Sequence, residues 1–103
     1  MDAIIIQIPD INDSFSRIII QDVAYLIRFT YNDTFDYWTF GVYTLERCPI
    51  IQGVKIVPGF PLNAFVDNEH MPNAIFACES KRENIGRDDF TNGNARFYYF
   101  EKA

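Results

Sequence analysis

The residues that could do chemistry together in this 103-residue chain lie in one short segment. His70, the only histidine, stands beside Glu69 and near Asp67 in the run D-N-E-H-M-P-N. A metal site or an acid–base pair needs several side chains that converge on such a histidine. The sequence supplies no second ligand motif, so we expect a solvated polar loop and predict no catalytic residue, no metal and no cofactor. An enzyme built on these three residues remains the third hypothesis for the function.

The two cysteines, Cys48 and Cys78, lack the spacing of a metal site and lie in no catalytic signature. The first ten residues have neither the basic start nor the long apolar run of a signal peptide, which indicates cytoplasmic synthesis with reduced thiols. A free cysteine behaves as a small hydrophobe. We therefore expect both thiols to be free and buried, with a disulfide between them as the alternative.

Charge argues against several classes of partner. The net charge is −5, from nine Lys and Arg against fourteen Asp and Glu. Nucleic acids and anionic membranes both require a basic footprint, so we expect neither as a partner. Neighbours on a strand point to opposite faces, so Asp88 and Asp89 are not expected to share a catalytic site. The pair is predicted to be solvated, helix-capping or turn-forming. An acidic balance is compatible with a protein partner that carries a basic patch.

The clearest strands are Val23 to Tyr31 and Tyr37 to Thr44, where apolar residues alternate with a period of two. Asn32-Asp33-Thr34 supplies a polar turn between them, so the two segments are predicted to form an antiparallel hairpin. Gly41 interrupts the second strand, and we expect it to admit a close backbone or a bulky neighbour.

The rest of the chain carries shorter strand patterns separated by turn residues. Turns are predicted at Gln21-Asp22 and Gln52-Gly53, and Lys81 to Asn94 is expected to be a loop with at most one short helical turn. Leu62 to Val66 fits either a strand or a helical turn. The remaining predicted strands are Ala3 to Ile8, Phe15 to Ile20, Val54 to Val57, Ala74 to Glu79 and Ala95 to Glu101.

These patterns predict one all-β domain over residues 1–103, mainly antiparallel. No window of the chain shows a convincing helical period. About seven short strands in one domain indicate a small sandwich or a partly open barrel, with at most one short helix.

Aromatic residues are unusually frequent, at 17 % of the chain. A domain of this size cannot hide all of them, and exposed apolar patches mark partner sites. The candidates for an exposed partner interface are Tyr37, Tyr43, Phe60 and Tyr98. A tightly packed core with a few scattered surface tyrosines explains the composition equally well. A third arrangement, a small-ligand-binding β-barrel, would line its cavity with Phe29, Phe40, Phe65 and Phe97.

The order of several motifs is more specific than any one of them. Ile8-Pro9 precedes the run Y-L-I-R-F-T-Y-N from Tyr25 to Asn32, which is followed by W-T-F-G-V from Trp38 to Val42. The glycine-bearing segment from Ile50 to Leu62, the triplet Asn84-Ile85-Gly86 and the closing aromatic strand complete the series. This series resembles a family of small bacteriophage and prophage proteins, the baseplate plug proteins of contractile tails.

The resemblance implies a structural component of a phage or prophage tail baseplate that acts by protein–protein packing as a central plug. It implies hub, spike or wedge proteins as partners, and it leaves a homo-oligomer open. The protein would be made in the bacterial host cytoplasm and end in the virion tail baseplate. No catalytic residues come with the resemblance.

Overall fold

Seven strands make up the regular structure of the computed structural model, which describes residues 3–59, 61–63 and 70–102. No helix long and apolar enough to cross a membrane occurs among these residues. The strands are β1 (Ile4–Ile6), β2 (Asp13–Ile20), β3 (Val23–Asn32), β4 (Tyr37–Tyr43), β5 (Pro49–Lys55), β6 (Ala74–Ser80) and β7 (Ala95–Glu101).

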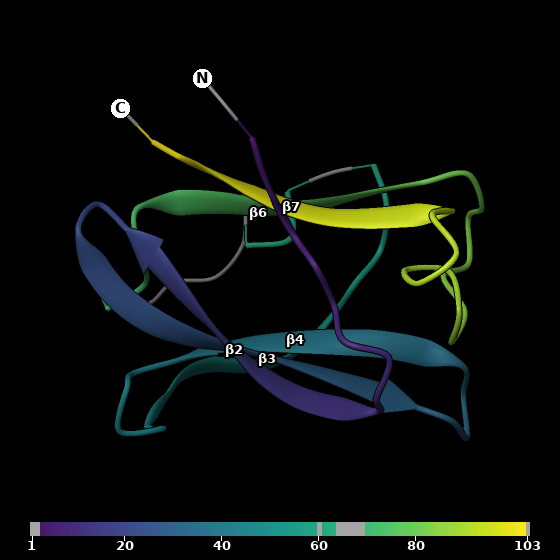
Figure 1. Ribbon diagram of the computed structural model, residues 1–103, viewed down its shortest axis with the longest axis horizontal. Coiled ribbons are helices and arrows are strands. Elements are labelled where there is room, and N and C mark those ends of the chain that lie inside the picture. Colours follow the sequence, from purple (N-terminus) through teal and green to yellow (C-terminus); the bar gives the residue numbers. More distant parts are fainter. Residues whose placement is uncertain (1–2, 60, 64–69, 103) are drawn as a thin grey trace.

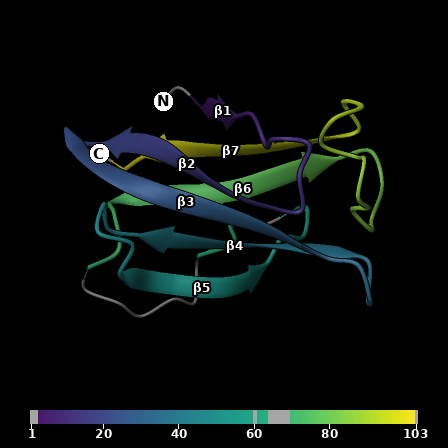
Figure 2. The same ribbon diagram turned by 60° about the horizontal axis from the view of Figure 1, so that its bottom comes forward.

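The strands form two antiparallel sheets that face each other as the layers of a sandwich (Figure 1). One sheet has three strands in the order β1-β7-β6, and the other is a meander in the order β2-β3-β4-β5 (Figure 2). The predicted all-β, antiparallel fold is confirmed, and the sandwich is the correct one of its two alternatives. The first and last strands pair in the same sheet, where Ile5 lies opposite Tyr98.

Two of the three hairpins of the larger sheet turn where the sequence predicts. Gln21 and Asp22 join β2 to β3 with φ angles of 50° and 66°, the left-handed geometry that a two-residue hairpin turn requires. At the next turn, the side-chain oxygen of Asn32 accepts hydrogen bonds from the backbone N–H groups of Thr34 and Phe35. The side chain of Asn32 thereby replaces a backbone acceptor and ends β3.

The turn predicted at Gln52-Gly53 is wrong, because β5 runs through it. Phe40 pairs with Val54 and Val42 with Ile51, so Gln52 and Gly53 together face Gly41. This is a β-bulge, in which Gly53 has a φ of 70°. Bulges and turns both place glycine at positive φ, so local sequence does not separate them.

Several boundaries also differ from the prediction. β1 ends at Ile6, before Pro9, and β2 begins two residues earlier than expected, at Asp13. Within 81–94 the chain forms bends and turns with no helix. Of the segment left open between strand and helix, Leu62 and Asn63 form a turn, and residues 64–66 lie outside the described part.

The core between the sheets is built around aromatic rings. Phe97 of β7 makes edge-to-face contacts with Phe29 and Phe40 of the opposite sheet, with ring centroids 5.0 and 5.1 Å away. All three rings are fully or almost fully buried. Edge-to-face geometry is the favourable arrangement for such rings and adds roughly 0.5–1.5 kcal/mol per pair to the burial of their area.

The loop 81–94 closes one end of the sandwich over Trp38. The indole N–H donates to the carbonyl oxygen of Gly86 at 3.1 Å, and the ring packs against that of Tyr31, its cross-strand neighbour. Asp89 is 2 % exposed and accepts hydrogen bonds from the Gly86 N–H and the Asn94 amide. The Asp88-Asp89 pair is therefore divided between an exposed residue and a turn-forming buried one.

Replacing Gly41 by alanine should destabilise the sandwich. The added Cβ would lie 2.7 Å from the carbonyl oxygen of Ile51 and 3.0 Å from the Cα of Gln52, and backbone atoms cannot move aside cheaply. Urea unfolding should show a loss of about 1–3 kcal/mol for Gly41→Ala. Gly86→Ala is the control, because its Cβ would find only ordinary contacts of 3.5 Å or more. Equal stabilities of the two variants would contradict the close packing at Gly41.

Acidification should weaken the loop anchor at Asp89. Burial opposes ionisation of this carboxyl, but the Gly86 and Asn94 hydrogen bonds and the charge of Arg82 outweigh it and lower its pKa. A lowered folded-state pKa stabilises the fold above the unfolded value of about 3.9, and this stabilisation is lost as the pH falls through the folded value. Between pH 6 and pH 3, the unfolding free energy of Asp89→Asn should fall less steeply than that of the wild type. A wild-type slope in Asp89→Asn would contradict the stabilising role of this ionised carboxylate.

Candidate functional site

The outer face of the three-stranded sheet is apolar and aromatic. Strand alternation turns Phe97 and Tyr99 of β7 inward, so Tyr98 and Phe100 point outward. Ile5 of β1 is the register partner of Tyr98 and shares this face, where its side chain is 53 % exposed. We call this surface, together with Ile75 and Ala77 of β6, the outer aromatic face.

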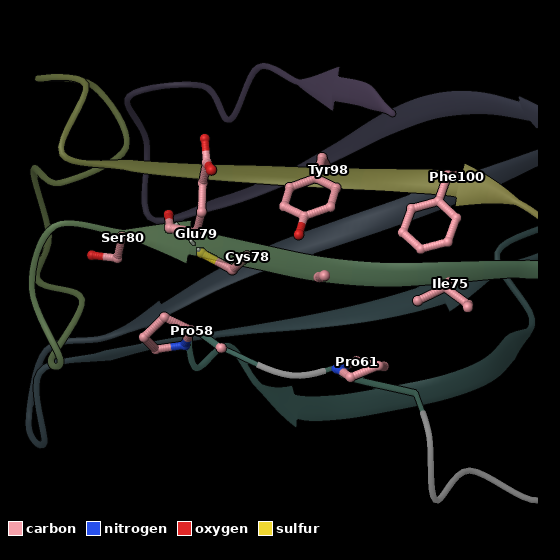
Figure 3. Close-up of a pocket in the computed structure, with 10 residues that line it drawn as sticks. Pro58, Pro61, Ile75, Cys78, Glu79, Ser80, Tyr98 and Phe100 are labelled. Carbon is pink, nitrogen blue, oxygen red and sulfur yellow. Dashed lines mark hydrogen bonds between the residues drawn. The ribbon is translucent and has the colours of Figure 1, made fainter. Parts of the chain in front are cut away.

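A groove crosses the outer aromatic face beside β6. Its volume is about 420 Å³. Tyr98 and Phe100 form one wall with stacked rings whose centroids lie 6.5 Å apart. Pro58 and Pro61 stand on the opposite side, across β6 (Figure 3). Such a groove, lined by aromatic and aliphatic side chains, is suited to take up apolar side chains of another molecule.

Hydrogen bonds hold the proline-bearing segment against the free edge of β6. The N–H of Leu62 donates to the carbonyl oxygen of Phe76 at 2.7 Å. The side-chain amide of Asn63 donates to the Ala74 carbonyl and accepts from the Phe76 N–H, as a neighbouring strand would. The edge is thus satisfied, and the groove wall is fixed in place.

Polar groups near the groove bond one another or the backbone. Glu79 and Arg96 form an exposed ion pair at 3.4 Å, and the Ser80 hydroxyl accepts from the Arg82 backbone N–H. Burial raises the pKa of the Cys78 thiol to about 12, which keeps it protonated near neutral pH. Among the described residues, no group of three His, Cys, Asp or Glu side chains could hold a metal ion. The aromatic, proline and aliphatic side chains of the lining offer apolar contact.

The residues proposed as exposed interface are separated by the fold. Tyr98 lies in the groove, whereas Tyr37 and Tyr43 are on the outside of the other sheet, and Phe60 lies outside the described part. Tyr37 is half-buried beneath the ammonium group of Lys55. The expected exposure of Tyr43 is wrong: the ring is 6 % exposed, because it packs against Phe15 over the space that Gly41 leaves empty.

Sequence reasoning missed most of the groove. Phe100 follows from the alternation that exposes Tyr98, so the strand pattern contained that signal. Pro58 and Pro61 reach the groove only through tertiary structure, and no local sequence pattern indicates their position there. The most exposed large apolar residue among those described is Phe35, at 73 %, and it too was missed. Its place at the tip of a polar turn was the available signal.

His70, the centre of the enzyme hypothesis, lies outside the groove lining. His70 is exposed and lines a separate hollow of about 450 Å³ with Cys48 and Tyr25. Asp67 and Glu69 lie outside the described residues. Both cysteines are free as expected, but Cys48 is exposed rather than buried, because it lies in the turn before β5.

The cavity expected for a small-ligand-binding β-barrel is filled by the rings that were predicted to line it. Phe29, Phe40 and Phe97 are at most 1 % exposed and pack against one another. These rings fill the space between the sheets. Phe65, the fourth residue of that hypothesis, lies outside the described part.

The sequence matches a known protein family along nearly its whole length. The model of the family described as cyanophage baseplate Pam3 plug gp18 covers residues 1–102. No curated protein matches the chain. The match spans both sheets and the outer aromatic face.

The two thiols should differ sharply in reactivity. At pH 8 the exposed Cys48 should react rapidly with a disulfide reagent such as Ellman's reagent, while the buried, protonated Cys78 should react only on unfolding. Cys48→Ser should remove the fast phase. Two fast equivalents in the native protein would show that the groove floor opens readily.

Proposed function

Because this chain belongs to the cyanophage baseplate Pam3 plug gp18 family, and so is a phage baseplate plug component, we propose that it serves as the central plug of a contractile-tail baseplate. The family match over residues 1–102 carries the proposal. The fold is consistent with it, since a rigid sandwich with a preformed apolar surface is suited to structural packing.

The proposed mechanism is shape-complementary packing at the outer aromatic face. Burying apolar area contributes roughly 25 cal/mol per Å², and interfaces gain most of their affinity from a few aromatic anchors at their centre. Tyr98 and Phe100 are the proposed anchors, because their stacked rings form one wall of the groove. Side chains from the partner would fill the groove between these rings and the two prolines.

The proposed partners are baseplate hub, spike or wedge proteins, and a second copy of the chain is an alternative occupant of the same face. The protein would act in the virion tail baseplate after synthesis in the cytoplasm of the bacterial host. Its role there would be assembly and closure of the tail, without a chemical step.

A charge placed in the groove should block assembly. Tyr98→Lys should weaken association with the baseplate hub, spike or wedge partner by roughly 30-fold or more, the effect of losing an interface hot spot. Coexpression and affinity purification would measure the association. Phe35→Lys is the matched control, since Phe35 is a solvent-exposed aromatic residue outside the groove lining.

Normal association of Tyr98→Lys would refute the groove as the contact surface. Normal particles from a phage that lacks the gene would refute the plug role itself. The fold of each variant can be checked by its circular dichroism spectrum and melting temperature.

A further inference from the structure

The outer face of the four-stranded sheet differs in charge from the rest of the chain. Arg17, Arg28 and Lys55 point outward from this sheet, as partners of Leu26, Gly41 and Thr39 in the strand register. Arg47 reaches the same face from the turn after β4. Four of the nine cationic residues of an acidic chain are thus collected on one surface, which we call the cationic face.

An aromatic ring organises the centre of the cationic face. The guanidinium groups of Arg47 and Arg28 lie 4.7 and 5.4 Å from the ring centroid of Phe15. Asp13 holds Arg28 in place through two hydrogen bonds, at 2.8 and 2.6 Å. These contacts orient the two cations before any partner arrives, which lowers the entropy cost of binding.

A polar hollow lies next to this ring. Its volume is about 270 Å³, and it lies beside Gly41 and the ring of Tyr43, which both line it. Arg28, Thr30, Thr39 and Gln52 line it. The Thr30 and Thr39 hydroxyls already donate to Asp13 and to the Thr30 carbonyl, so the remaining donors are N–H groups of Arg28 and of the Gln52 amide. A carboxylate side chain has the size and the acceptors that such a hollow accommodates.

Arg47 occupies a backbone position that favours glycine. Its φ is 66°, a left-handed conformation that is strained for arginine. Hydrogen bonds fix the turn: Arg47 N–H donates to the Thr44 carbonyl, and Cys48 N–H donates to the Thr44 hydroxyl. No carboxylate of the described residues lies within ion-pair distance of Arg47, Arg17 or Lys55. The turn thus holds a strained cation over Phe15.

We propose that the cationic face binds an acidic segment of a partner protein, with one carboxylate in the hollow lined by Arg28 and Gln52 and another against Arg47. Charge complementarity identifies the occupant as acidic. A protein segment is favoured over nucleic acid because four cations on a chain of net charge −5 give a small footprint for a polyphosphate. The inference is independent of the baseplate role, because it rests on the opposite face of the sandwich.

Titration of the isotopically labelled protein with a short peptide of alternating Glu and Ser tests the proposal. Backbone amide signals of Thr39, Gly41, Gln52 and Gly53 should shift, and the shifts should shrink with added salt. The same peptide with Gln in place of Glu should leave these signals unchanged. Shifts confined to other surfaces, or none, would overturn the proposal, and so would tighter binding of oligothymidylate at this face.

The Arg47→Gly variant is expected to lower peptide affinity without lowering the stability of the fold. Glycine relieves the strained φ, so the melting temperature should stay near that of the wild type, while affinity for the Glu peptide should fall about threefold, as for one exposed ion pair. Lys55→Ala should have a similar effect. Lys81→Ala removes the same charge from outside the cationic face and should bind as the wild type does. Unchanged affinity in both Arg47→Gly and Lys55→Ala would refute the proposal.

Discussion

The contact of Phe97 with Phe29 and Phe40 joins the two sheets, and the remaining surfaces follow from it. Truncation of a buried phenylalanine costs about 3–5 kcal/mol, a large part of the stability of a small domain. Because side chains alternate along a strand, fixing Phe97 and Tyr99 toward the core commits Tyr98 and Phe100 to the outside. The outer aromatic face is therefore the other side of the same strand that builds the core.

The larger sheet obeys the same constraint with a different result. Phe29 and Ile27 point into the core, so Arg28 and Leu26 point out. The bulge in β5 and the empty position at Gly41 allow Tyr43 to fold down against Phe15, leaving a hollow among polar side chains. The two outer faces of one small sandwich are consequently unlike, one apolar and one cationic. A component that bears two different surfaces can contact two different neighbours.

Rigidity is the property that these features share. Within the loop 81–94, the Asp89 carboxylate accepts a hydrogen bond from the Gly86 N–H, and the Trp38 indole donates to the Gly86 carbonyl. At the edge of β6, the Asn63 side chain accepts from the Phe76 N–H. Hydrogen-bonded loops leave preformed surfaces, so little order has to be gained on binding. Such a molecule is suited to the structural role of a baseplate plug family, in which recognition depends on shape and charge.

The sequence by itself determined the strands with strict alternation, the Gln21-Asp22 turn, the close approach at Gly41 and, through the order of its motifs, the family. Apart from the order of the motifs, which extends over the whole chain, these features depend on residues near one another in the sequence. Tertiary structure alone decided that Gln52-Gly53 is a bulge, that Tyr43 and Asp89 are buried, and that Pro58 and Pro61 meet Tyr98. Of the candidate site, only Tyr98 was foreseen. Whether the outer face of a strand is exposed depends on which distant segments cover that face. The local alternation of residues does not contain this information.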